Sequence, residues 1–458
     1  MASTQAQMSD ARGLYPWRAV PAASSHGRLL AVSAAFTAVL VSLPVVGQEA
    51  PEPGASVAAG RNQDVLHWEG DGGRELTITG WVAADGLSFP QTEAGFGPSQ
   101  QTTFRLAAAR VSARFEQSQH LRGKLDAELS GQSPEAAEAW VEYAPVSWLG
   151  ARAGRFKVPF GLAQQLNTPE RRLMDAPMLA GNPKDFQDVG FGLFGRVPGD
   201  WVEYGVATVT GSRDIAVDVN DTPDVAGRLV VRPMAPLGPW LSGLSLGGSG
   251  VLGRSPTAHG FRGRTLAGYT FADPPTVRGD QLKWGAEVCW TMPRLQLLAE
   301  YQSLALSREG ITASQKLTSG LSTVEGLSDY EVSGWYAEAA WHFWGESSGT
   351  TPVNGIEVAA RFESLDFGDG SRKVKAASSP SDKPEFENRG PLPDGWSEAL
   401  TVGLTGYFGP HLRVTAAWQG IRFSHASFAP DHPEVSTPGS GPAGDWVQQF
   451  FLRTMLLF

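Results

Sequence analysis

The sequence predicts an all-β fold, a closed antiparallel barrel that crosses a membrane with sixteen strands. Three observations predict it. Segments in which apolar and polar residues alternate follow one another over 74–458. The connections between these segments are alternately short and long. The last segment places Phe450 and Leu452 on one face and Gln449 and Arg453 on the other. A transmembrane barrel has this combination, because its outside faces lipid and its lumen faces water.

The composition suits a lipid-exposed surface. Only 18% of the 458 residues are charged, 10% are aromatic, and 15 are tryptophan. Soluble domains carry about 25% charged residues. The formal net charge of −10 gives no electrostatic support to nucleic-acid binding. The single cysteine, Cys289, excludes an internal disulfide and is expected to pack as a small apolar residue.

The amino-terminal segment has the layout of an export signal. An apolar run over 29–46 follows Arg28 and precedes small residues. We therefore expect 1–47 to be a secretory signal peptide and 48–73, rich in Pro, Gly and Ala, to be a flexible leader. The remaining residues, 74–458, are expected to form the barrel. A transmembrane helix is the competing interpretation of the apolar run, which Pro44 near its end disfavours.

Sixteen segments of the chain alternate with period two and are expected to be strands. An even number of strands is what single-chain bacterial barrels have. The expected strands are 74–88, 103–116, 121–131, 137–144, 149–158, 188–197, 201–210, 224–233, 240–252, 281–292, 294–307, 329–344, 354–367, 396–408, 411–425 and 446–458.

The parity of the connections is the stronger evidence for a barrel. Short connections are expected at residues 117–120, 144–146, 198–200, 234–239, 293, 345–353 and 409–410. The connections between them are long, with a modest one near 132–136; they include 89–102, 159–187, 211–223, 253–280, 308–328, 368–395 and 426–445. Outer-membrane barrels have short periplasmic turns and long extracellular loops, whereas a soluble sandwich has no reason to keep this parity.

The two faces of each strand differ consistently. Around residue 335, Trp335 and Trp341 share one face, while Glu338 and His342 share the other. The same sorting recurs around residues 202, 284 and 356. A lipid-facing exterior must be apolar, whereas a wet lumen holds charges. We therefore expect a polar interior, which favours a channel over a filled core.

One motif carries a family resemblance. Gly154-Arg-Phe-Lys-Val-Pro-Phe-Gly161 follows the strand Ala139-Trp-Val-Glu-Tyr143, and Phe156 and Val158 are expected to face lipid while Arg155 and Lys157 face the lumen. In these residues the chain resembles the phosphate-selective porin O and P family. The resemblance implies a sixteen-stranded, homotrimeric anion channel in the bacterial outer membrane, in which the loop 159–187 folds inward and narrows the pore.

The expected pore-lining and anion-binding residues are basic. Arginine suits this task because its planar donors hold phosphate oxygens bidentately. The candidates are Arg155, Lys157, Arg171, Arg172, Lys184, Arg228 and Arg232, and further lumen-phase arginines are Arg110, Arg114, Arg361, Arg413 and Arg453. The competing interpretation is structural, because lumen-phase glutamates are available to neutralise each of them: Glu142, Glu203, Glu287, Glu300, Glu338, Glu357 and Glu363.

Signals for an enzyme are weak. Gly190-Phe-Gly-Leu-Phe-Gly195 fits a dinucleotide-binding pattern but lies within an expected strand with no helix after it. The eight histidines show no zinc-ligand spacing. We expect no catalytic residues, no metal and no cofactor, and passive diffusion of small anions such as phosphate, with membrane lipid as the other partner. The alternatives are a non-selective or cation-preferring porin and a structural or enzymatic outer-membrane barrel.

Overall fold

The computed structural model describes the strands, the tight turns and parts of the long connections. The described residues are 66–70, 73–88, 103–131, 134–180, 186–211, 222–235, 237–238, 240–266, 270–272, 275–316, 322–326, 329–348, 351–368, 373–375, 395–424 and 446–458. The expected signal peptide and most of the expected leader lie outside them. Among the described residues, no helix has the length and apolar character needed to span a bilayer.

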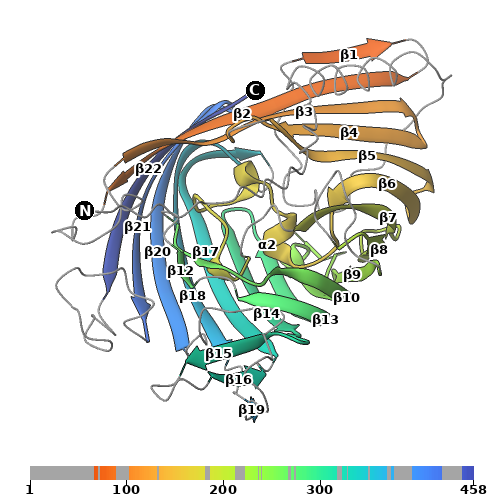
Figure 1. The fold of residues 1–458 in the computed structure, drawn as a ribbon. Coiled ribbons are helices and arrows are strands. Elements are labelled where there is room, and N and C mark those ends of the chain that lie inside the picture. Colours follow the sequence, from red (N-terminus) through yellow and green to blue (C-terminus); the bar gives the residue numbers. More distant parts are fainter. Residues whose placement is uncertain are drawn as a thin grey trace, which may run out of the picture. The chain divides into compact units, whose positions relative to one another are not determined.

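The fold is a closed antiparallel barrel of sixteen strands, as predicted (Figure 1). Each expected strand is present, with ends displaced by a few residues or more where strands continue into the outer loops. The barrel strands are β2 (Arg74–Ser88), β3 (Thr103–Ser118), β4 (Leu121–Glu128), β5 (Glu135–Val146), β6 (Leu149–Lys157), β7 (Gln187–Arg196), β8 (Val202–Val209), β9 (Asp224–Val231), β10 (Leu244–His259), β13 (Thr276–Thr291), β14 (Leu295–Leu306), β17 (Tyr330–Ser348), β18 (Thr351–Gly368), β20 (Gly395–Phe408), β21 (Leu412–Phe423) and β22 (Val447–Leu457).

The barrel closes between its first and last strands. β22 pairs antiparallel with β2, and the backbone of Phe458 exchanges hydrogen bonds with Gly80, 2.9 Å from the Phe458 nitrogen to the Gly80 oxygen. A glycine is required at position 80 because a Cβ atom there would lie 2.6 Å from both the Phe458 ring and the Arg110 carbonyl oxygen. Closure leaves no long unpaired edge in the membrane.

A short extra strand extends the sheet beyond the end of β22. β1 (Leu66–Gly70) pairs antiparallel with Arg74–Ile78 of β2. Residues 66–70 belong to the segment that we expected to be a flexible leader, and for these residues that expectation is wrong. The physical reason is that β2 continues past its last contact with β22, so its free N–H and C=O groups need a partner.

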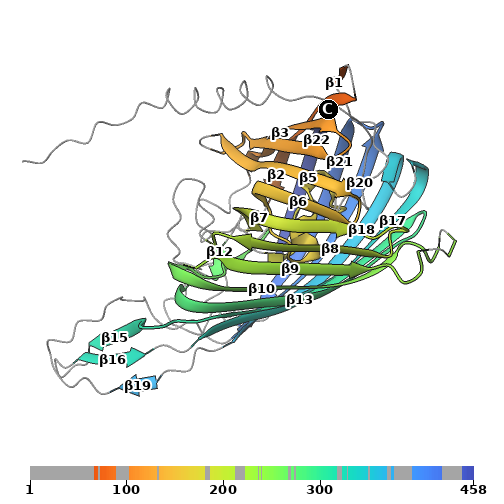
Figure 2. The same ribbon diagram turned by 90° about the vertical axis from the view of Figure 1, so that its right-hand side faces the viewer.

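Two small sheets lie outside the barrel ladder. β11 (Gly263–Arg264) pairs with β12 (Thr270–Ala272). β16 (Ser322–Gly326) pairs with both β15 (Thr312–Lys316) and β19 (Lys373–Lys375), and this three-stranded sheet lies beyond the ends of the barrel strands in Figure 2. All of these strands belong to long connections, whereas the opposite rim has the tight turns, so the predicted parity is confirmed.

The predicted sorting of the two faces is also confirmed. Trp335, Trp341 and Leu452 are exposed, whereas Glu338 and Arg453 are buried. The exposed apolar side chains suit a lipid environment and the buried polar ones line the interior.

The interior is less polar than expected on one side. Phe156 and Val158, which we expected to face lipid, are buried among aromatic and aliphatic side chains. Phe156 packs edge-on against Phe194 with a 5.6 Å centroid separation, and Phe160 stacks on Phe186. The phase follows from Arg152, which points inward to Glu142 at 2.6 Å, so the even-numbered positions of β6 face the interior.

Candidate pore constriction

The loop between β6 and β7, described over residues 158–180 and 186, folds into the barrel; we call it L3. Its described part contains three short helices, α2 (Leu162–Gln165), η3 (Thr168–Glu170) and η4 (Met178–Ala180), and Figure 1 shows α2 inside the ring of strands. Most of these side chains are buried. The described part of L3 therefore lies inside the barrel.

The start of L3 is fixed to β14. Both oxygens of the Glu300 carboxylate accept backbone hydrogen bonds, from Leu162 at 2.8 Å and from Ala163 at 2.9 Å. Gly161 turns the chain with φ 64°, and a Cβ atom there would lie 2.8 Å from the Glu300 carboxylate. Only glycine gives both the left-handed conformation and the close approach. Gln302 donates to the same carboxylate at 2.6 Å.

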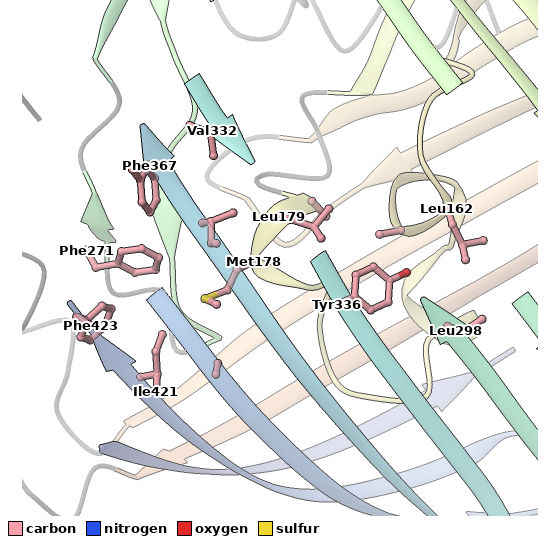
Figure 3. Close-up of a cluster of buried hydrophobic side chains, with 14 of the residues drawn as sticks. Leu162, Met178, Leu179, Phe271, Leu298, Val332, Tyr336, Phe367, Ile421 and Phe423 are labelled. Carbon is pink, nitrogen blue, oxygen red and sulfur yellow. The ribbon is translucent and has the colours of Figure 1, made fainter. Parts of the chain in front are cut away.

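Farther along, L3 packs on the wall opposite its origin. Figure 3 shows Met178 and Leu179 of η4 among side chains of β17, β18 and β21, and Leu162 of α2 near Leu298 and Tyr336. These residues belong to one buried apolar cluster. Burial of an aliphatic or aromatic side chain contributes roughly 1.5–3 kcal/mol. L3 is therefore held by packing as well as by hydrogen bonds.

A buried arginine braces the same part of L3. Arg361 of β18 is only 2% exposed and lies between Glu338 and Glu363, at 3.4 and 3.3 Å. It also donates to the backbone carbonyl oxygens of Asp175 and Ala176, at 3.0 and 3.4 Å. The guanidinium thus joins two wall carboxylates to the loop.

Arg171 and Arg172 of L3 are buried and hold the loop in place through hydrogen bonds and an ion pair. Arg171 donates to the Leu166 carbonyl oxygen at 3.0 Å, and Arg172 contacts Gln296 at 2.8 Å and Glu357 at 3.5 Å. Burial lowers the pKa of Arg171, whereas for Arg172 the effect of burial is outweighed by Glu357 and the pKa is raised. The Arg171 contact joins L3 to itself, and the two Arg172 contacts join L3 to the barrel wall.

The other predicted residues of this region have varied positions. Arg155 is half-buried, and its Nε donates to the Ala137 carbonyl oxygen at 3.2 Å. Lys157 reaches into L3, where its Nζ donates to the Gln165 carbonyl oxygen at 2.6 Å. Lys184 lies outside the described residues.

Arg228 and Arg232 form ion pairs on the lumen wall. Arg228 forms an ion pair with Glu287, and Arg232 lies 2.9 Å from Glu203. The same pairing recurs around the barrel, where Glu142 holds both Arg122 and Arg152 at 2.6 Å. Much of the basic lumen charge is therefore balanced locally, as the competing interpretation expected.

A second inward loop was not anticipated; its described residues are 260–266, 270–272 and 275, and we call it L5. Phe271 lies 5.1 Å from Phe423 and 6.1 Å from Phe367, measured between ring centroids, and Leu266 is buried beside Met174 of L3. The apolar residues of the loop were the available sequence signal, since an exposed loop has little use for Phe261, Leu266 and Phe271 together.

L3 and L5 border a cavity of about 360 Å³ against the wall formed by β3, β18, β21 and β22. Its charged lining residues are Arg105, Asp175, Arg264, Glu363 and Arg453, and the other lining residues are Leu106, Ala107, Ala108, Thr168, Ala176, Pro177, Met178, Thr265, Leu266 and Gln419.

The charged groups of this cavity differ in how far they are neutralised. The Asp85 carboxylate forms ion pairs with two arginines, Arg105 at 3.0 Å and Arg453 at 2.6 Å. The side chain of Arg264 is exposed and has no hydrogen-bond or ion-pair partner within the part of the chain that the structure describes. The basic groups therefore outnumber the carboxylates that contact them here.

The sequence matches the model of one protein family, and this match supports the resemblance. Residues 260–429 match the model of the phosphate-selective porin O and P family. The predicted resemblance to this family is confirmed by the match, which runs from L5 past the end of β21 and does not include the motif at 154–161. No protein with a curated description matches the sequence. The family match and the barrel together indicate a porin of the bacterial outer membrane rather than an enzyme.

Solved structures share the fold at low sequence identity. An anion-selective porin from Comamonas acidovorans is 12% identical, with a TM-score of 0.53, and the match covers 84% of this chain and all of that one. OmpT, an outer membrane protein of Vibrio cholerae, is 8% identical over 84% of this chain and 98% of its own, with a TM-score of 0.52. The outer membrane channel DcaP of Acinetobacter baumannii is 10% identical over 86% and 100%, with a TM-score of 0.50. At these identities the likeness shows the fold alone.

Proposed function

We propose that this chain is an outer-membrane porin through which small solutes diffuse passively, with a preference for anions, which include phosphate, over cations. The observation that carries the anion preference is Arg264, whose side chain has no partner among the described residues and which lines the same cavity as Arg105 and Arg453, two arginines that share one carboxylate. The family match supports phosphate as a member of the solute class. The proposal contains no reaction chemistry, no metal and no cofactor.

The route would run along the cavity between L3 and L5. Cationic side chains there attract anions, and a site with several partly satisfied donors binds weakly enough to release them. The buried Arg171 and Arg172 would act indirectly, by fixing the loop that sets the width. Arg228 and Arg232 would contribute little to the lumen field because Glu287 and Glu203 largely neutralise them. Arg155 and Lys157 would help to fix the start of L3 and its strand through their hydrogen bonds to backbone carbonyl oxygens.

Assembly is part of the proposal. The resemblance to the phosphate-selective porin O and P family implies a homotrimer. The OmpT structures that share the fold include a trimer form, which is 8% identical to this chain. Membrane lipid would cover the remaining exposed apolar surface.

We expect the variants Arg264→Gln and Arg105→Gln each to reduce the anion-to-cation permeability ratio by about fivefold, since one charge acting at 4 Å in water contributes about 1 kcal/mol. The measurement is the reversal potential of purified protein in a planar bilayer under a KCl gradient.

The matched control is Arg254→Gln. Arg254 is an exposed arginine that pairs with Asp280 and Glu309 and does not line the cavity. A reversal potential that responds equally to all three substitutions, or to none, would contradict the assignment of selectivity to the cavity.

A further inference from the structure

The cavity between L3 and L5 is lined by hydrogen-bond donors and acceptors that belong to different elements. Arg105 of β3 and Arg453 of β22 lie on one stretch of wall, joined through Asp85 of β2. Arg105 also donates to the Leu266 carbonyl oxygen of L5 at 3.3 Å, so L5 and its Arg264 approach the cavity at this cationic stretch.

The acceptors belong to different elements. The carboxylate of Asp175 on L3 is 40% exposed; its Oδ1 atom accepts the backbone hydrogen bond of Ala176 at 3.0 Å, and its ion-pair partner among the described residues is Arg171, at a loose 3.9 Å. On β21, Gln419 is fully buried and donates from Nε2 to Thr401 at 3.1 Å. That bond leaves the Gln419 Oε1 atom without a partner among the described residues, at a residue that lines the cavity.

The third candidate acceptor is already satisfied. Glu363 binds Arg361 at 3.3 Å and accepts the backbone hydrogen bond of Met178 at 2.5 Å. Asp175 and Gln419 are therefore the acceptors available to a solute.

Arg264, Asp175 and Gln419 together favour solutes with a particular distribution of charge. A simple anion satisfies Arg264 but brings its charge near the Asp175 carboxylate, and like charges repel. A neutral solute gains from neither side. A solute that carries an anionic group and an ammonium in one small molecule places each charge against its complement. A volume of about 360 Å³ lies in the range of small-molecule sites.

We propose that this cavity favours the passage of small zwitterions, with free amino acids as the simplest class. The carboxylate end is received by Arg264 and Arg105, and the ammonium end by Asp175 and the Gln419 oxygen. The inference rests on the proposed porin function and names the solute class that the same constriction serves best.

The test uses three solutes with one carbon skeleton: alanine as the zwitterion, lactate as the anion and lactamide as the neutral molecule. Tracer uptake into proteoliposomes is measured for each at pH 7, with the membrane potential held at zero by potassium and valinomycin. The native protein is expected to take up alanine faster than lactate and lactamide.

Two variants assign the effect to the cavity. Asp175→Asn is expected to slow alanine by roughly twofold to fivefold, the range of one partly exposed ion pair, while lactate is unchanged or faster. Arg264→Gln is expected to slow alanine and lactate and to leave lactamide unchanged. Lactamide uptake also reports how much folded channel each preparation contains.

The matched control is Asp200→Asn, the same chemical change at an exposed carboxylate in the tight turn between β7 and β8. It is expected to leave the uptake of all three solutes unchanged. Native uptake of lactate that equals or exceeds that of alanine, or an Asp175→Asn variant that keeps the native ratio, overturns the zwitterion inference and leaves the porin standing. Absence of uptake for all three solutes overturns the porin proposal as well.

Discussion

Replacement of Arg361 by alanine is expected to destabilise the barrel by roughly 3–5 kcal/mol, because it leaves buried carboxylates without their cation. Glu338 and Glu363 lie 3.4 and 3.3 Å from this guanidinium. The substitution also removes the donors to the L3 carbonyl oxygens of Asp175 and Ala176. Urea unfolding of the refolded protein in detergent, followed by tryptophan fluorescence, measures the loss.

The control for this variant is Arg254→Ala. Arg254 also pairs with two carboxylates, Asp280 and Glu309, but its side chain is 52% exposed. Exposed pairs contribute about 0–1 kcal/mol. Equal free energies of unfolding for the two variants would show that burial of the Arg361 cluster does not determine its contribution.

Replacement of Glu300 by alanine is expected to release the start of L3 and to give a larger, more variable single-channel conductance. The substitution removes the acceptor of the Leu162 and Ala163 N–H groups, and each unsatisfied buried group costs about 1–3 kcal/mol. Planar-bilayer recording measures the conductance.

Two further variants sharpen this experiment. Glu300→Gln keeps one acceptor oxygen and should behave between the native protein and the alanine variant. Glu309→Ala removes a half-exposed carboxylate from the outer rim and should leave conductance unchanged. If Glu300→Ala conducts as the native protein does, the carboxylate does not hold the loop in place.

The strands were predictable because the physical constraint on them is local. A residue that faces lipid must be apolar, and its two neighbours in the strand must face the lumen. The constraint can be recognised within a single strand. Exposed Trp335 lies next to buried Tyr336, and exposed Trp284 lies next to buried Lys283. The same constraint explains why the parity of turns and loops could be recognised.

The inner surface was less predictable because its partners are distant in the sequence. Arg453 binds Asp85 across 368 positions, and Arg361 binds the backbone of L3 across 186. Nothing near Arg228 in the sequence indicates that Glu287 neutralises it. Whether a lumen arginine is free or paired therefore depends on the closed barrel.

The apolar residues in and near the two inward loops were also difficult to place from the sequence alone. Phe156 lies inside because L3 and the neighbouring strands bring aromatic groups around it, so an apolar residue in this stretch does not imply lipid contact. Arg264 was not proposed as a site residue because L5 looked like an ordinary outer loop. Its role depends on Phe271, which anchors L5 against Phe367 and Phe423.

The most direct test of the central claim is the reversal potential of the purified native protein in a planar bilayer under a KCl gradient, with phosphate then added. An anion-selective reversal, with current reduced by phosphate, is the expected result, because the constriction carries more basic groups than the carboxylates that contact them. A cation-selective or neutral reversal would contradict the anion preference and keep the barrel. A folded preparation that forms no channel would contradict the porin itself.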